Sequence, residues 1–178
     1  MPVLGSRMRT RRANGSAAAL AAVAIAVASA PHAAADPNEY AINGTYSVVS
    51  NGEWAQMNER YQDEPSVQST WTINTTCATP ISCAGKVTSS LGWTEDVYTT
   101  SGRNWYVRHY VPEWIPCPDG GAAPGLQVYR FYPADESGNP AEQSDVMIGE
   151  ERTTGESGNC GRNSSLVLSL PVKLTKLD

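Results

Sequence analysis

The segment Val67-Gln-Ser-Thr-Trp-Thr-Ile-Asn-Thr-Thr-Cys77 decides the fold class of this chain. Apolar or small residues alternate along it with polar ones, and a Thr-rich alternation of period two is typical of a half-buried strand. The residues expected on its buried face are Val67, Ser69, Trp71, Ile73, Thr75 and Cys77. The segment therefore predicts a β-sheet that packs one face and exposes the other.

The same alternation recurs along the rest of the chain. Three further sets expected on the buried face are Val87, Ser89, Leu91 and Trp93; Trp105, Val107, His109 and Val111; and Leu126, Val128, Arg130 and Tyr132. The clearest set is Leu166, Leu168, Leu170, Val172 and Leu174. Pro171 falls on the opposite face of that last run. Because proline has no ladder hydrogen bond to donate, it predicts an edge or a bulge there.

Turn signals separate these runs. Asn51-Gly52 lies between two strand-like stretches and predicts a hairpin turn. Helix signals are weak, and at the one candidate, residues 54–62, a short helix competes with a strand. The runs amount to about eight strands, joined mostly in sequence order. We therefore predict an all-β fold, a single antiparallel domain whose strands form a meander closed into a small lipocalin-like β-barrel, with a β-sandwich as the alternative.

The first 35 residues predict export. Four arginines precede an apolar run over residues 17–28, and Ala33-Ala34-Ala35 supplies the small residues that a signal peptidase needs. The run is shorter than the roughly 20 apolar residues of a membrane-spanning helix. We expect 1–35 to be a cleaved signal peptide and 36–178 to be a secreted β-domain. That domain would have no transmembrane anchor after processing and would lie outside the cell or in the cell envelope.

The chain is acidic, with 18 Asp and Glu against 13 Lys and Arg among its 178 residues. Residues 1–35 hold four of the arginines and none of the acids, so 36–178 carries nine basic and 18 acidic residues, a formal net charge of −9. A domain with this charge is repelled by phosphate backbones. Nucleic acid is therefore excluded as a partner.

All four cysteines lie in the expected secreted part, and an even number in an exported domain predicts two disulfides. Four cysteines allow three pairings, of which we favour Cys77–Cys83 and Cys117–Cys160. The first would pinch a turn between two strands, and the second would join the Pro/Gly-rich loop at 112–125 to the loop at 153–163. A zinc site is the functional alternative. No paired C-x-x-C pattern is present, so we expect no metal.

Sequence patterns that indicate catalysis are sparse. The one histidine of the expected secreted part is His109, which lies in the same alternating set as Trp105. Adjacent acidic residues on a strand point to opposite faces and do not meet across one substrate. No P-loop, dinucleotide fingerprint, zinc-protease motif or EF-hand loop occurs. We expect no catalytic residue and no cofactor, and a hydrolase that uses His109 is the least favoured function.

Aromatic residues are the strongest functional signal. The run from Trp105 to Tyr110 places aromatic side chains on both faces of one strand. The segment Pro112–Gly120 reads as a loop, and its Trp114 is either a cover over the core or a contact surface. The ligand-binding candidates are Trp105, Tyr106, Arg108, His109, Tyr110 and Trp114.

We expect the domain to bind rather than to catalyse. The favoured partner is a small apolar ligand, which a barrel of about eight strands can hold. The alternative is an interaction module for an envelope component, either glycan or protein, that uses the Trp114 loop. The oligomeric state stays open.

Several short motifs resemble those of a group of small secreted mycobacterial (actinobacterial) proteins of unknown function. The motifs are Gly52-Glu53-Trp54, Trp71-Thr72-Ile73, Gly92-Trp93, Trp105, Cys117-Pro118-Asp119-Gly120, Tyr129-Arg130-Phe131 and Cys160-Gly161. The resemblance covers most of 40–178, and Cys-Pro-Asp-Gly is its most specific piece. The cysteine and tryptophan spacings resemble, less closely, extracellular modules of bacterial sensor kinases. The resemblance implies a cell-envelope or culture-filtrate protein and brings no catalytic residues.

Overall fold

The computed structural model describes residues 36–178. The expected signal peptide, 1–35, lies outside the described residues. Within the described range, no helix has the length and apolar character needed to cross a membrane. In chain order the elements are η1 (Pro37–Tyr40), β1 (Gly44–Ser50), η2 (Gly52–Trp54), β2 (Gln56–Met57), β3 (Arg60–Tyr61), β4 (Val67–Thr79), β5 (Ser82–Ser89), β6 (Thr94–Thr99), β7 (Trp105–Pro116), β8 (Ala122–Pro133), β9 (Val146–Gly155), η3 (Asn159–Gly161) and β10 (Leu166–Lys176).

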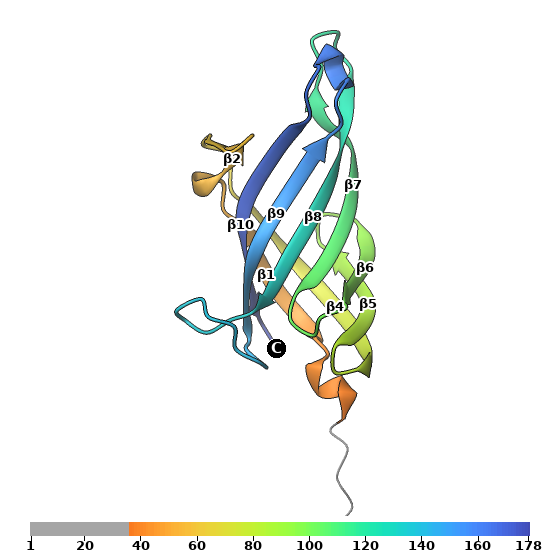
Figure 1. Ribbon diagram of the computed structural model, residues 1–178, viewed down its shortest axis with the longest axis vertical. Helices are drawn as coiled ribbons and strands as arrows, with labels where there is room; N and C mark the ends of the chain where they lie inside the picture. Colours follow the sequence, from red (N-terminus) through yellow and green to blue (C-terminus); the bar gives the residue numbers. More distant parts are fainter. Residues whose placement is uncertain (1–35) are drawn as a thin grey trace, which may run out of the picture. The chain divides into compact units, whose positions relative to one another are not determined.

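Eight of these strands form a closed antiparallel barrel (Figure 1). β4 to β10 pair with one another in chain order, and β1 pairs with both β4 and β10, which closes the sheet. The short β2–β3 hairpin pairs with β10 beside the closure. The predicted all-β barrel is therefore confirmed. The sandwich alternative is wrong, because one continuous ladder runs around the whole sheet.

Aromatic and branched side chains fill the middle of the barrel. Trp71, Trp105 and Phe131 are each at most 1 % exposed. Trp71 makes edge-on contacts with Tyr129 and Phe131, at ring-centroid distances of 4.8 and 6.1 Å. An eight-stranded barrel has an interior just wide enough for such side chains. The barrel middle is thus a packed core, and space for a ligand has to be sought at the barrel ends or on the outer surface.

The sequence assigned the wrong face of β8 to the core. Leu126 and Arg130 are exposed, and with Val128 and Tyr132 they lie on the outer face, whereas Tyr129 and Phe131 are buried. Side chains alternate strictly along a strand, so only one of the two sets can be inside. Burying the two aromatic rings removes more apolar surface from water than burying the leucine and valine would. The outer face of β8 therefore carries apolar and basic residues.

The hairpin predicted at Asn51-Gly52 is also wrong. Asn51 instead caps η2, because its Oδ1 accepts from the Glu53 backbone N–H at 3.0 Å. A Cβ on Gly52 would come within 1.9 Å of the Glu64 carbonyl oxygen, so this glycine serves a close backbone approach. Residues 54–62, the helix candidate, form only the last residue of η2 and then the β2–β3 hairpin.

Pro171 lies where β10 changes partners. β10 pairs with β1 from Val172 onward and with β2 at Leu168 and Ser169. Between these ladders the Pro171 carbonyl accepts from the Asn51 N–H at 2.9 Å. The position at which proline cannot donate therefore falls between the β1 ladder and the β2 ladder. The predicted edge or bulge is not found there; β10 changes partner instead.

The two barrel ends carry different connections. The end that holds η1 and the β4–β5, β6–β7 and β8–β9 connections is called the η1 end; the other is the opposite end. The Cys77–Cys83 disulfide joins two register partners near the η1 end. The Cys117–Cys160 disulfide joins the β7–β8 turn to η3 at the opposite end. Both favoured pairings are present.

Removing the disulfides should destabilise the barrel unequally. The Cys117–Cys160 bridge spans 43 residues and the Cys77–Cys83 bridge spans six. Chain-entropy estimates give about 4 kcal/mol for the longer loop and about 2 kcal/mol for the shorter one. Urea unfolding of the Cys117→Ser/Cys160→Ser and Cys77→Ser/Cys83→Ser variants measures both losses. A larger loss for the shorter bridge would contradict this account.

Candidate functional site

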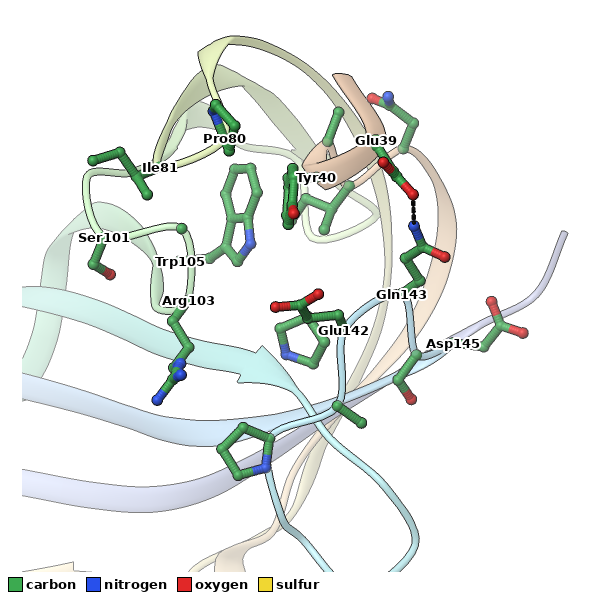
Figure 2. A pocket seen from close by; sticks show the side chains of 18 of the residues that line it. Glu39, Tyr40, Pro80, Ile81, Ser101, Arg103, Trp105, Glu142, Gln143 and Asp145 are labelled. Carbon is green, nitrogen blue, oxygen red and sulfur yellow. Dashed lines mark hydrogen bonds between the residues drawn. The ribbon is translucent and has the colours of Figure 1, made fainter. Parts of the chain in front are cut away.

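A pocket of about 510 Å³ opens at the η1 end of the barrel. Its walls come from η1, the β4–β5 turn, the β6–β7 and β8–β9 loops and the end of β10 (Figure 2). Ligand pockets of small molecules commonly measure about 300–1,000 Å³. The pocket therefore has room for one small molecule.

The floor of the pocket is the end of the packed core. Trp105, Ile42 and Tyr46 line it, and all three are buried. Figure 2 shows the Trp105 indole beside Tyr40, between the β4–β5 turn and the β8–β9 loop. Ile81 on the β4–β5 turn is 59 % exposed and adds an apolar side chain to the rim. A ligand in the pocket would meet an aromatic and aliphatic surface below it.

The segment before β1 crosses this end of the barrel and is held by side-chain hydrogen bonds. The Cys77 N–H donates to Asn38 Oδ1 at 3.0 Å, and the Thr75 N–H donates to Asn43 Oδ1 at 2.6 Å. Across the pocket, Gln143 Nε2 donates to Glu39 Oε1 at 2.8 Å (Figure 2). These bonds fix η1 to β4 and link it to the β8–β9 loop.

The rim is charged. Glu39, Glu142 and Asp145 face Arg103 and Lys176 around the opening, and no ion pair within 4.0 Å joins these five in the described range. Their charges are therefore open to a ligand.

Burial, Asp145 and Asp178 together raise the pKa of Tyr46 to about 12. The Tyr46 hydroxyl consequently stays neutral in ordinary buffers. The floor of the pocket thus offers a hydroxyl group without adding a charge.

A buried polar cluster lies further inside the barrel. The Glu151 carboxylate accepts hydrogen bonds from the Ser50 hydroxyl, from Gln127 Nε2 at 2.5 Å and from the Tyr129 hydroxyl. Burial raises the pKa of Glu151, and these hydrogen bonds offset part of the rise. The cluster lines no described pocket, so its role in the fold is to hold four interior side chains together.

The six candidates for ligand binding are not brought together. Trp105 alone lines the pocket at the η1 end. Tyr106 lies on the outer face and stacks on Tyr98 at a centroid distance of 5.8 Å. Arg108 and Tyr110 are exposed on the same outer face, farther along β7.

His109 lies on the inner face of β7 and is half-buried. Its Nδ1 is 3.1 Å from Glu95 Oε1, and its ring stacks on Trp93 at a centroid distance of 4.7 Å. The β6–β7 ladder consists of only two residue pairs, so Trp93 and His109 lie beyond its end. The pair fills the space where β6 and β7 separate.

Trp114 belongs to a strand rather than to the predicted loop. β7 continues to Pro116 after a register shift between Val111 and Ile115. A Cβ on Gly125 would lie 2.6 Å from the Trp114 ring, and a Cβ on Gly155 would lie 3.0 Å from it. The indole therefore packs on these two glycines.

The sequence did not identify most of the pocket. Tyr40, Ile81, Arg103 and Glu142 lie in η1, turns and loops, where no strand periodicity marks which side chains face inward. Pro80 and Gly102 mark turns but not the walls of a shared cavity.

Comparisons with known proteins show similarity of fold. No family model matches the sequence, and no curated protein matches it. The structure resembles the monomer form of the M. tuberculosis PknI sensor domain, with a TM-score of 0.55 and 15 % identity. The match covers 76 % of this chain and 87 % of that one. The likeness to a secreted mycobacterial family thus remains a prediction, although the structural neighbour is mycobacterial.

Replacing Glu151 by Gln should reduce the pH dependence of stability. Because the pKa of Glu151 is raised in the folded state, the folded chain binds more protons than the unfolded chain above the ordinary glutamate pKa. The unfolding free energy of the wild type therefore falls as pH rises between the ordinary and the raised pKa. Urea unfolding across that range measures the slope.

The matched control is Glu150→Gln, which removes the same charge from the outer face. It should keep the wild-type slope, whereas Glu151→Gln should flatten it. Equal slopes in the wild type and Glu151→Gln would show that the buried carboxyl does not titrate in this way.

Proposed function

We propose that the chain is an extracellular binding domain and that its site is the pocket at the η1 end. The ligand is a small molecule with an apolar body and a polar group. The observation that carries this proposal is the combination of the Trp105 floor with an unpaired charged rim in one pocket of about 510 Å³.

The expected ligand remains mainly apolar because of the floor. Trp105, Ile42 and the exposed Ile81 offer an apolar surface that a hydrocarbon or ring system would cover. Removing such a surface from water contributes roughly 25 cal/mol per Å². The pocket is too near the packed core to extend inward, so the ligand lies across the barrel end.

The charged rim implies that the ligand also has a polar part. Glu142 and Asp145 come from the β8–β9 loop, and Arg103 comes from the β6–β7 loop on the other side of the opening. A few placed polar groups around an apolar pocket fix the orientation of a ligand. The proposal therefore names an amphipathic molecule rather than a pure hydrocarbon.

The fold comparison supports a binding role. The neighbour is a sensor domain, and a sensor domain needs a site for its stimulus. At 15 % identity the comparison shows the fold alone, so the ligand class is argued from the pocket. The expected signal peptide and the two disulfides support a location outside the cytoplasm.

Replacing Ile81 by Arg should abolish binding at the pocket. The side chain is exposed on a turn, so the change leaves the core intact while adding a charge to the apolar rim. The fluorescent probe N-phenyl-1-naphthylamine, titrated into the folded domain, reports on binding. Native mass spectrometry of protein exported by its own host identifies any bound molecule.

Leu91→Arg is the matched control, because Leu91 is 55 % exposed on the β5–β6 turn at the opposite end. It should bind the probe like the wild type. Equal binding by the wild type, Ile81→Arg and Leu91→Arg, or no binding by any of them, would refute the pocket as the site.

A further inference from the structure

We infer that the outer face of β7 to β10 is a second binding surface and that it takes a carboxylate-bearing glycan chain. The register places Arg108, Val128 and Arg152 side by side across β7, β8 and β9. Adjacent strands are about 4.8 Å apart, so the two arginines flank Val128 about 10 Å from each other. All three side chains belong to the outward set of their strands.

Arg130 completes a triangle with these two arginines. It follows Val128 by two residues on the same outer face of β8 and is also exposed. A diagonal neighbour on a sheet lies about 7–8 Å away, which is its separation from both Arg108 and Arg152. The three guanidinium groups therefore share one apolar centre, Val128.

None of the three arginines forms an ion pair in the described range. Within residues 36–178, Arg108, Arg130 and Arg152 have no carboxylate oxygen within 4.0 Å. The domain as a whole carries a formal net charge of −9, so the patch opposes the prevailing charge of the molecule. Unpaired guanidinium groups bind carboxylate and phosphate oxygens in a bidentate fashion.

A groove of about 620 Å³ continues from the triangle across β9, β10 and β1. Arg130 and Lys173 are its cationic residues, and Tyr132, Ile148 and Pro171 provide apolar surface. In register, Tyr132 pairs with Ile148, which pairs with Lys173. A linear chain along the groove would therefore meet cations and apolar surface in succession.

Glu150 is the acidic residue in this groove. It is half-buried and pairs in register with both Arg130 and Pro171. Its negative charge repels an anionic ligand. Neutralising Glu150 should therefore strengthen binding, whereas neutralising one of the arginines should weaken it.

The closed sheet favours a glycan over a peptide. A peptide that adds to a sheet needs a free strand edge, but β8 and β9, which carry Arg130 and Arg152, are each paired on both sides. Recognition on this face must come from side chains alone. Guanidinium groups suit the carboxylates of an acidic sugar, and the rings of Tyr106 and Tyr110 beside them suit its C–H faces.

Titration with oligogalacturonate tests the inference, with neutral dextran as the reference. The wild type should bind oligogalacturonate and not dextran. Arg130→Gln and Arg152→Gln should each weaken binding about tenfold, as expected for the loss of a charged hydrogen-bond donor. Glu150→Gln should strengthen it.

Arg162→Gln is the matched control, since Arg162 is exposed beside η3 at the opposite end and carries the same charge. It should leave the affinity unchanged. An equal loss in Arg162→Gln would reduce the effect to diffuse electrostatics and would overturn the site. Ile81→Arg should also bind oligogalacturonate normally, which separates this surface from the pocket at the η1 end.

Poly-glutamate and phosphatidylglycerol vesicles serve as competitors of other classes. Displacement of oligogalacturonate by either one at lower charge concentration would assign the face to an acidic protein or a membrane and would overturn the glycan. Absence of oligogalacturonate binding by the folded wild type would also overturn the proposal.

Discussion

The ladder between β1 and β10 is the contact on which the rest of the molecule depends. It joins the first barrel strand to the last, from Tyr46 paired with Lys176 to Ser50 paired with Val172. Such a contact is remote in sequence, so the entropy of closing a long chain opposes it. The packed interior offsets that cost because Tyr46 and Val172 point into the same core. Once closed, the sheet provides both a fixed ring at the η1 end and a rigid outer face.

The two proposed surfaces use this frame in different ways. The pocket at the η1 end is built from connections, with Trp105 contributed by the barrel itself. The outer face with Arg108, Arg130 and Arg152 is built from strand residues. The sheet ladder therefore fixes the distances between their Cα atoms. A side chain on a strand is held more rigidly than one on a loop. We therefore expect the pocket to adapt to its ligand and the outer face to act as a preformed array.

Sequence reasoning identified the parts of the fold that follow from alternation. Trp71, Ile73, Val172 and Leu174 are buried as their period-two spacing predicts, and both cysteine pairings are present. It failed at β8, where both faces carry apolar residues and alternation cannot choose between Leu126 and Tyr129. It also missed the pocket, because cavities between loops depend on tertiary arrangement. Among the six site candidates, Trp105 is the residue that reaches it.

Side-chain bonds, rather than ladder bonds, attach η1 to the barrel. Asn38 and Asn43 reach β4 by their amide oxygens, and Glu39 reaches the β8–β9 loop. Substitutions in these connections can thus alter the walls of the pocket while every strand keeps its partner. Proteins that share this barrel can therefore evolve different ligand preferences while their architecture is conserved. Their structural similarity then outlasts any detectable sequence similarity.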